Sequence, residues 1–376
     1  MVISRRHAFA AVAAALASPH AAQAAEGDIL VGQIGPFTGI PVPDAAQLNE
    51  GLKSAFAQAN AHGGIGGRKV AFFELDDTYT GDGFVKAFAE AMARKPVALL
   101  SLLGSVALKR MLDDKLLDRA DVVVLNAVPG AEALRNPGHA KLFHVRAGDR
   151  QQIEKIVGHA RTLGITSLAV LHQNIPIGSS GLAMAAESAK RAGTIALKPF
   201  EATLEQPSLA AAAAQVAKSG AQAALVLGAP RFMADGVAEL RKAGVGQFVF
   251  ALSYVPAGLL VKVAGAGARG VALAQTYPNP MGATLPLQRE FQAAMKAAFP
   301  NTTSYTSFHL EGFITARVFV EAARRAQPLT PDGLARALRA MGEIDLGGFR
   351  VDFSKGNAGS RFVDIGVVNA DGRLIY

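Results

Sequence analysis

Short runs of consecutive apolar residues alternate along the chain with longer segments in which apolar residues recur every three or four positions. The continuous runs are typical of strands covered on both faces of a sheet, and the spaced segments are typical of amphipathic helices. Because strands and helices alternate, the sequence predicts parallel sheets with right-handed crossover connections. The predicted strands span residues 29–34, 69–75, 97–102, 122–125, 167–171, 223–227 and 248–252.

Three of the predicted helices have recognisable ends. The first stops at the glycine pair Gly63-Gly64. Ser105 stands at the start of the second, where a serine hydroxyl can cap free backbone N–H groups. Asp149 begins the third helix, and Gln152 three residues later completes a capping-box pattern. Each signal therefore marks a junction between a helix and a loop.

The strand–helix units are too numerous for one sheet of ordinary size. The pattern also starts afresh near residue 150, after a short apolar stretch at residues 143–146. We therefore predict an α/β fold made of two doubly wound parallel-sheet lobes. Ligands of such sheets bind beyond the carboxyl ends of the strands, so two facing lobes would enclose a cleft that closes by a hinge motion.

Residues 1–25 are typical of an export signal. Arg5 and Arg6 form the positive region, residues 8–17 form a short apolar stretch, and Ala22-Gln23-Ala24 is a small-residue cleavage site. The apolar stretch is too short to span a bilayer. We therefore expect cleavage near Ala24-Ala25 and a soluble mature chain in the periplasm.

Composition excludes several classes of site. The chain contains no cysteine, which excludes disulfides, thiolate metal sites, iron–sulfur clusters and a lipid anchor on cysteine. The formal net charge is +8, but the basic residues form no long block and no stripe interleaved with aromatic residues. The sequence therefore gives no support for nucleic-acid binding.

The glycine motif Gly265-x-Gly267-x-x-Gly270 matches the spelling of a dinucleotide-binding fingerprint. That fingerprint must follow a strand and open a helix, whereas this motif follows a predicted helix and precedes a predicted strand. We interpret it as a loop between the lobes, and we predict no nucleotide cofactor.

Other candidate catalytic residues lack the required spacing. His309 and Glu311 are too close in sequence to be two metal ligands on one helix face. The carboxylate pair Asp76-Asp77 follows a predicted strand and is better placed for capping or hinge hydrogen bonds than for acid catalysis. The sequence therefore predicts a protein that is not an enzyme and has no metal site.

Several ordered motifs resemble one family over nearly the whole mature chain. They are the strand and turn at residues 31–39, the helix end at residues 59–69, the acidic Glu74-x-Asp76-Asp77, Phe143-x-Val145-Arg146, and Leu240-Arg241-x-Ala243-Gly244. Together they resemble the leucine/isoleucine/valine-binding family, the periplasmic solute-binding proteins of ABC importers. The resemblance implies the type I periplasmic-binding fold, in which a three-strand hinge joins two discontinuous lobes. Lobe 1 would hold residues 27–147 and 278–346, and lobe 2 would hold residues 148–277 and 347–376.

The resemblance also implies where a ligand carboxylate is held. The family binds it with a serine and neighbouring backbone amides after the third strand, which here correspond to Leu103, Gly104 and Ser105. A helix start favours an anion, although Ser105 could equally be a simple cap. The next turn of the family offers Ala-x-Thr, and this chain has Ala127 and Pro129 there, without the hydroxyl.

The ammonium end of the family's site is changed. Amino-acid-binding members carry a tyrosine and a glutamate in loops that here read Ala229 and Ser253-Tyr254, without an acid. An unpaired buried ammonium ion is costly, so a small organic or aromatic acid fits better than a branched-chain amino acid. The side chains expected to line the ligand are Phe37, Tyr254 and Tyr277. Asp44 is the acid that could restore an ammonium site, so an amino acid remains the alternative.

The resemblance implies a function in transport. We expect a monomer that captures its ligand between the lobes and delivers it unaltered to an ABC permease in the inner membrane. The alternative is a ligand-sensing receptor domain that acts in signalling.

Overall fold

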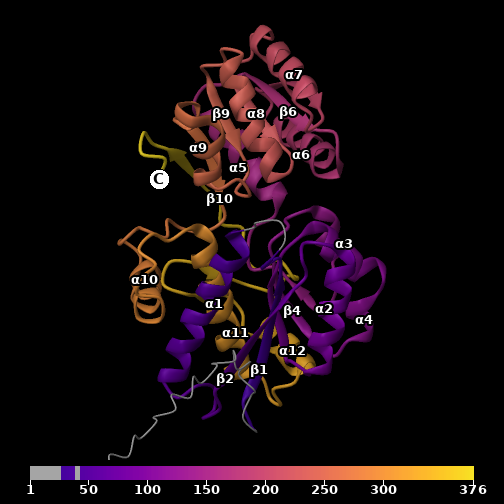
Figure 1. Cartoon of the computed structure of the whole chain (residues 1–376), viewed down its shortest axis with the longest axis vertical. Helices are drawn as coiled ribbons and strands as arrows, with labels where there is room; N and C mark the ends of the chain where they lie inside the picture. Colours follow the sequence, from indigo (N-terminus) through magenta and orange to yellow (C-terminus); the bar gives the residue numbers. More distant parts are fainter. Residues whose placement is uncertain (1–26, 39–42) are drawn as a thin grey trace, which may run out of the picture.

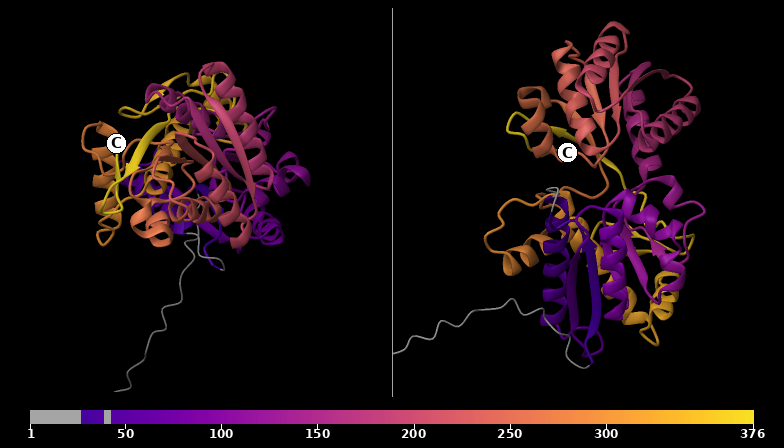
Figure 2. Two further views of the ribbon diagram at one scale, coloured as in Figure 1. Left: turned by 90° about the horizontal axis from the view of Figure 1, so that it is seen from above. Right: turned by 45° about the vertical axis from the view of Figure 1, so that its right-hand side comes forward.

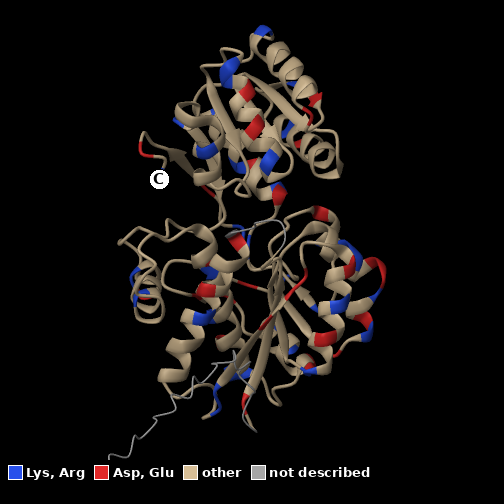
Figure 3. Cartoon of the chain, viewed as in Figure 1, with Lys and Arg blue, Asp and Glu red and all other residues tan. Residues whose placement is uncertain are grey.

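The computed structural model of the protein describes residues 27–38 and 43–376, and the predicted export signal lies outside these ranges. Two α/β lobes are stacked along the long axis of the molecule (Figure 1). None of the helices in the described ranges combines the length and apolarity that crossing a bilayer requires. Basic and acidic residues are interspersed over both lobes (Figure 3).

Lobe 1 is built on a five-stranded parallel sheet with the order β2-β1-β3-β4-β5. Its strands are β1 (Ile29–Gly35), β2 (Val70–Asp76), β3 (Ala98–Leu102), β4 (Val123–Ala127) and β5 (Leu142–Phe143). One apolar core lies between this sheet and the helices α1 (Pro43–Ala61), α10 (Pro286–Ala298), α11 (Ser307–Arg325) and α12 (Pro331–Ala340). A second core lies on the other face, under α2 (Gly81–Ala93), α3 (Ser105–Asp113) and α4 (Leu116–Arg119).

Lobe 2 contains a seven-stranded sheet with the order β14-β13-β10-β9-β8-β6-β7. Five strands are parallel, namely β6 (Ser167–Gln173), β7 (Ala196–Ala202), β8 (Ala223–Leu227), β9 (Phe248–Ala251) and β10 (Val271–Gln275). The C-terminal strands β13 (Asp364–Val368) and β14 (Leu374–Ile375) pair antiparallel at one edge. The helices are α5 (Asp149–Thr162), α6 (Pro176–Ala192), α7 (Gln206–Lys218), α8 (Pro230–Lys242) and α9 (Ala257–Ala264). The predicted class of two parallel-sheet lobes is confirmed.

The chain passes between the lobes three times, after β5, after β10 and before β13 (Figure 2). The first and third passages are hydrogen-bonded to each other. The His144 N–H donates to the carbonyl of Asn357 at 2.7 Å, and the Gly359 N–H donates to the carbonyl of His144 at 2.8 Å. The hinge therefore contains a direct link between two of its connections.

The structure differs from the expected lobe boundary after residue 346. A short hairpin of β11 (Ile344–Asp345) and β12 (Arg350–Val351) places Phe349, Val351 and Phe353 in the core of lobe 1. These apolar side chains are fully covered there, so the chain returns to lobe 2 later than the family resemblance implied.

The glycine motif at residues 265–270 is also placed differently from our expectation. Gly265–Ala268 form a short 3₁₀ helix that follows α9 and precedes β10, so the order required for dinucleotide binding is absent. The Arg241 side chain of α8 donates to the Gly267 carbonyl at 3.1 Å. The motif therefore lies at the surface of lobe 2 and is not a loop between the lobes.

Two glycines allow α1 and α11 to lie in close contact. A Cβ atom on Gly51 would overlap the carbonyl of His309, and a Cβ atom on Gly312 would overlap the carbonyl of Leu48. Any larger residue would push the helices apart. This close packing fixes α1 and α11 relative to each other, and both helices carry acidic residues of the site.

Candidate functional site

The carboxyl ends of the parallel strands of both lobes point toward the junction between the lobes (Figure 1). In lobe 1, the loops after β1, β2, β3 and β4 lie at this edge, and in lobe 2 the loops after β8 and β9 do so. Open parallel sheets bind ligands at such edges. The fold therefore places the loops that carry Phe37, Ser105 and Ala229 at the facing edges of the two sheets.

Within residues 27–38 and 43–376, no side chain caps the start of α3. Gly104, with a φ of 86°, is the N-cap residue, and Ser105 is the first residue of the helix. The expected capping role of Ser105 is therefore wrong, because its side chain is exposed and makes no cap hydrogen bond. Among the described residues, none is recorded as accepting the first backbone N–H groups of α3, so these groups are available to a partner outside the helix.

Leu103 and Phe37 belong to a small apolar cluster beside this helix start. Leu103 is buried with residues of α1 and α11, and Phe37 packs against the cluster while half-buried. Phe37 therefore stays partly accessible, whereas Leu103 contributes mainly to packing. In the next loop, Ala127 is buried at the end of β4 and Pro129 is half-buried.

Asp44 lies in the first turn of α1 and is half-buried. Burial and then the Glu311 carboxylate raise the pKa of Asp44 to about 6, although Arg146 acts in the opposite direction. The ionised form of Asp44 is thus poorly stabilised by the protein itself.

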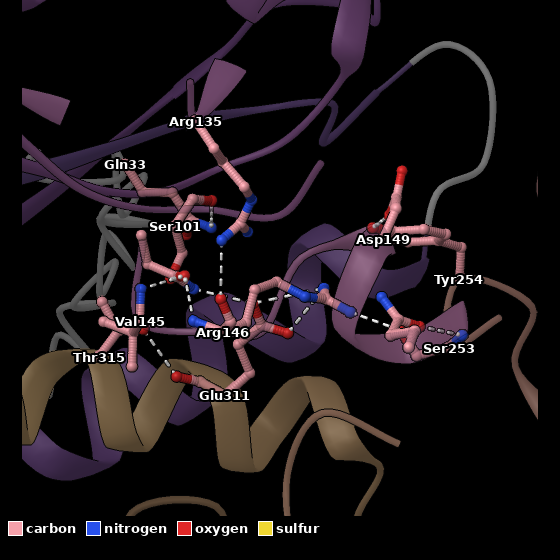
Figure 4. A network of polar contacts seen from close by, with 12 residues as sticks. Gln33, Ser101, Arg135, Val145, Arg146, Asp149, Ser253, Tyr254, Glu311 and Thr315 are labelled. Atoms are coloured by element: carbon pink, nitrogen blue, oxygen red, sulfur yellow. Dashed lines mark hydrogen bonds and ion pairs between the residues drawn. The ribbon is translucent and has the colours of Figure 1, made fainter. Parts of the chain in front are cut away.

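A fully buried guanidinium group occupies the first passage between the lobes (Figure 4). Arg146 Nη1 lies 3.2 Å from Glu311 Oε2, and Asn126 donates to the same carboxylate at 2.8 Å. Arg146 Nη2 donates to Ser253 Oγ of lobe 2 at 2.6 Å. Arg146 therefore joins α11 of lobe 1 to the loop after β9 of lobe 2.

Tyr254 completes this hinge network. The Arg146 guanidinium lies over the face of the Tyr254 ring, with 5.1 Å between the guanidinium carbon and the ring centroid. The Tyr254 hydroxyl donates to the Asp149 carboxylate. Burial, followed by the nearby Asp149 carboxylate, raises the pKa of Tyr254. The Ser253 N–H donates to Gln152 Oε1 at 2.9 Å. Ser253 and Tyr254 are thus engaged within the protein, which differs from the ligand-lining role expected for Tyr254.

Gln152 is not part of a capping box, because its side-chain oxygen accepts the Ser253 N–H. The N–H of Gly148 donates to Gln151 Oε1 at 3.0 Å, so the preceding glutamine makes this contact, and the glycine N-cap has no side chain that could complete a box. The pattern was placed one residue late because α5 is capped by Gly148 and begins at Asp149.

Two further expected ligand residues lie in other surroundings. Tyr277 is fully buried in the core of lobe 1, with its ring centroid 5.2 Å from that of Phe349. Ala229 precedes α8 and donates its N–H to Gln173 Oε1 at 2.9 Å. Tyr277 therefore supports the hinge, while half-buried Ala229 lies at the edge of lobe 2 that faces lobe 1.

The sequence analysis missed the roles of Arg146, Glu311 and Asn126. Arg146 was noted only as part of a family motif, and Glu311 only as an improbable metal ligand beside His309. The structure separates that pair, because His309 Nε2 lies 3.3 Å from Glu50 while Glu311 faces Arg146. A charged residue inside an apolar stretch was the available signal, because such a charge needs a buried partner.

The comparisons with known proteins support the two-lobed fold. The chain matches the periplasmic binding protein family over residues 28–373. A solved extracellular ligand-binding receptor from Verminephrobacter eiseniae is 55% identical, with a TM-score of 0.88, over 93% of this chain and 100% of that chain. A substrate-binding periplasmic protein from Ralstonia solanacearum is 28% identical, with a TM-score of 0.81, over 93% of this chain and 99% of that chain.

A third structure shares the fold at lower identity. It is a possible leucine/isoleucine/valine-binding protein from Rhodopirellula baltica, 20% identical with a TM-score of 0.79, over 96% of this chain and 98% of that chain. Among curated proteins, no relative matches significantly. The match over most of the chain shows that it belongs to the periplasmic binding protein family, whose members bind solutes in the periplasm and are not enzymes.

Proposed function

We propose that this protein captures a small carboxylate-bearing solute between its lobes and delivers it unaltered to the permease of an ABC importer. The observation that carries the proposal is the uncapped start of α3 at Gly104 and Ser105. Its open N–H groups and the positive end of the helix dipole favour a carboxylate, and the exposed Ser105 hydroxyl can donate a further hydrogen bond.

The lobe 2 side of the site supports an organic acid over an amino acid. Ala229 contributes only backbone there, and the Ser253 hydroxyl is already bound by Arg146. An ammonium group would therefore depend on Asp44 in lobe 1. We propose an organic or aromatic acid as the ligand, with Phe37 as an apolar contact, and keep an amino acid held by Asp44 as the alternative.

Capture would follow from differential affinity. A ligand that contacts both lobes binds the closed arrangement more tightly than the open one and shifts the population toward closure. The permease would then recognise the closed form.

A thermal-shift screen of aromatic acids, aliphatic acids and branched-chain amino acids tests the ligand class. A ligand at 100 times its Kd adds about 2.7 kcal/mol to the free energy of unfolding, which gives a clear rise in melting temperature. We expect the acids to raise the melting temperature. A shift with leucine or valine and none with the organic acids would show that the proposed ligand class is wrong.

The variant Ser105→Ala tests the carboxylate site. It should weaken binding of a carboxylate ligand by roughly 1–3 kcal/mol, because a hydrogen bond to a charged group is lost. Lys109→Ala is the control, since Lys109 is exposed on the same helix and pairs with Asp113. Equal affinities for Ser105→Ala and the unmodified protein would remove Ser105 from the site.

Uptake of the labelled ligand by cells separates transport from sensing. Cells that lack the protein should lose uptake and regain it when the protein is restored. Unchanged uptake combined with loss of a ligand-induced response would support the sensing alternative.

A further inference from the structure

The loop after β2 contains two consecutive residues in the left-handed backbone region. Thr78 has a φ of 50° and Tyr79 a φ of 60°. This conformation is uncommon for any residue other than glycine, and it is especially unfavourable for a β-branched residue such as threonine. Strained backbone of this kind persists only where the surroundings hold it, and it gathers at functional sites.

The carboxylate pair Asp76-Asp77 holds this loop. Asp76 Oδ1 accepts hydrogen bonds from the N–H groups of Phe37 and Thr78, both at 3.0 Å. Asp77 Oδ1 accepts the N–H of Tyr79 at 2.8 Å. The pair therefore acts through hydrogen bonds to backbone, and it fixes the loops after β1 and β2 to each other.

Tyr79 follows the carboxyl end of β2, at the edge of the lobe 1 sheet where the start of α3 also lies. The ring lies over the backbone of Gly104, where an added Cβ atom would be 3.4 Å from Tyr79 Cε2. Burial, followed by the nearby Asp44 and Asp77 carboxylates, raises the pKa of Tyr79. Tyr79 is thus close to both Asp44 and the start of α3.

Packing alone does not account for this conformation, because 44% of Tyr79 is exposed. A tyrosine with this exposure gains only part of the stabilisation that full burial would give against the strain of its backbone. We propose that Tyr79 is a specificity-determining residue whose ring covers the apolar part of a bound aromatic acid, and that Asp76-Asp77 hold it in position. This inference rests on the proposed function.

Calorimetric titration with benzoate and cyclohexanecarboxylate tests the proposal. Each probe has one carboxylate on a six-membered ring, but only benzoate is aromatic. Tyr79→Ala should weaken benzoate binding about twofold to tenfold, the range expected for an aromatic pair, and cyclohexanecarboxylate binding less. The benzoate affinity of Tyr79→Phe should stay within about twofold of that of the unmodified protein, because the ring is retained.

Two further variants separate binding from folding. Tyr79→Gly removes the ring and adopts a positive φ freely, so its unliganded melting temperature should equal or exceed that of the unmodified protein while benzoate affinity falls. Phe248→Ala is the matched control, because Phe248 is 52% exposed at the amino end of β9, away from the facing edges. Its benzoate affinity should not change.

The outcomes distinguish this inference from the proposed function. If the unmodified protein binds no carboxylic acid, the proposed function fails and this inference fails with it. If it binds benzoate and Tyr79→Ala binds benzoate equally well, only the role of Tyr79 is overturned. If the unmodified protein binds other carboxylic acids but not benzoate, the aromatic preference is overturned and the proposed carboxylate site is not.

Discussion

Charged and aromatic side chains lie both in the hinge and on the side of lobe 1 that faces lobe 2. The two regions differ in how far these side chains have hydrogen-bond or ionic partners within the protein. In the hinge, Arg146 pairs with Glu311 and Ser253, and the Tyr254 hydroxyl binds Asp149. On the facing side of lobe 1, the Ser105 hydroxyl caps nothing and nearly half of Tyr79 is exposed.

The difference separates residues that set the geometry from residues that remain available to a ligand. A buried charge must be paired within the protein, because an unpaired one is strongly destabilising. A ligand site instead needs groups whose partners arrive with the ligand. We therefore expect substitutions in the hinge to change mainly the free energy of unfolding, and substitutions facing lobe 2 to change mainly affinity.

The largest effect is expected for Glu311→Ala. It leaves the Arg146 guanidinium buried without its carboxylate, which should lower the free energy of unfolding by about 3–5 kcal/mol in urea denaturation. Glu321→Ala is the control on the same helix, where Glu321 pairs with Arg324 and Arg325 near the surface and should contribute under about 1 kcal/mol.

The double variant Glu311→Leu with Arg146→Met sharpens this prediction. Removing both charges should restore most of the lost stability, because the unpaired charge and not the missing contact causes the loss. If Glu311→Ala alone is as stable as the unmodified protein, the hinge pair does not constrain the lobes.

A smaller loss of stability is expected for Gly130→Ala. The new Cβ atom would overlap the Tyr254 hydroxyl and lie 2.5 Å from Asp149 Oδ1. Overpacking at this point should lower the free energy of unfolding by about 1–3 kcal/mol. Adding Tyr254→Phe should recover part of the loss, whereas Gly158→Ala in open space on α5 should not destabilise the protein.

Asp44→Asn should stabilise the unliganded protein at neutral pH. Burial raises the pKa of Asp44 from its ordinary value of 3.8 to about 6 in the folded protein, so the folded state disfavours the ionised carboxylate. The variant should gain about 1–3 kcal/mol near pH 7.5, and the gain should vanish below about pH 4, where Asp44 is protonated in both states. Urea unfolding at several pH values measures this, with the exposed Asp121→Asn as control.

The same titration distinguishes the two ligand classes. An organic acid should bind more tightly as the pH falls through about 6, because protonation removes the negative charge of Asp44 from the site. A ligand whose ammonium group pairs with Asp44 should bind more weakly over the same interval. Affinities that do not change between about pH 5 and 7 would place Asp44 outside the ligand site.

The smallest effect on stability is expected for Ser105→Ala, which removes no cap and should change the free energy of unfolding by less than about 0.5 kcal/mol. Thr80→Ala gives the contrast. Thr80 Oγ1 accepts the N–H of Gly83 at 3.0 Å at the start of α2, and its loss should cost about 1 kcal/mol. Equal losses in the two variants would mean that Ser105 does stabilise α3.

The buried strands could be predicted from sequence because both of their faces are covered. Residues 223–227 match β8 residue for residue. Strand β7 (Ala196–Ala202) was missed because it lies at the edge of the sheet, is partly exposed and contains Pro199. Edge strands lack the continuous apolar run on which the prediction depends, and proline is tolerated there.

The candidate site could be predicted only in part. The ends of the predicted strands locate the loops of the candidate site, so Ser105 and Asp44 could be named from the sequence. The hinge could not be predicted in the same way, because Arg146 and Glu311 are 165 positions apart and no local spacing connects them. The exposure of Tyr79 and the engagement of Tyr254 likewise depend on contacts between distant segments.

The hydrogen bonds that join the first and third passages at His144 have a mechanical consequence. Two connections tied side by side resist twisting of one lobe against the other, and they leave bending about a single axis as the easiest motion. We therefore expect the protein to open and close along one coordinate, so a membrane partner could read its state from a single angle.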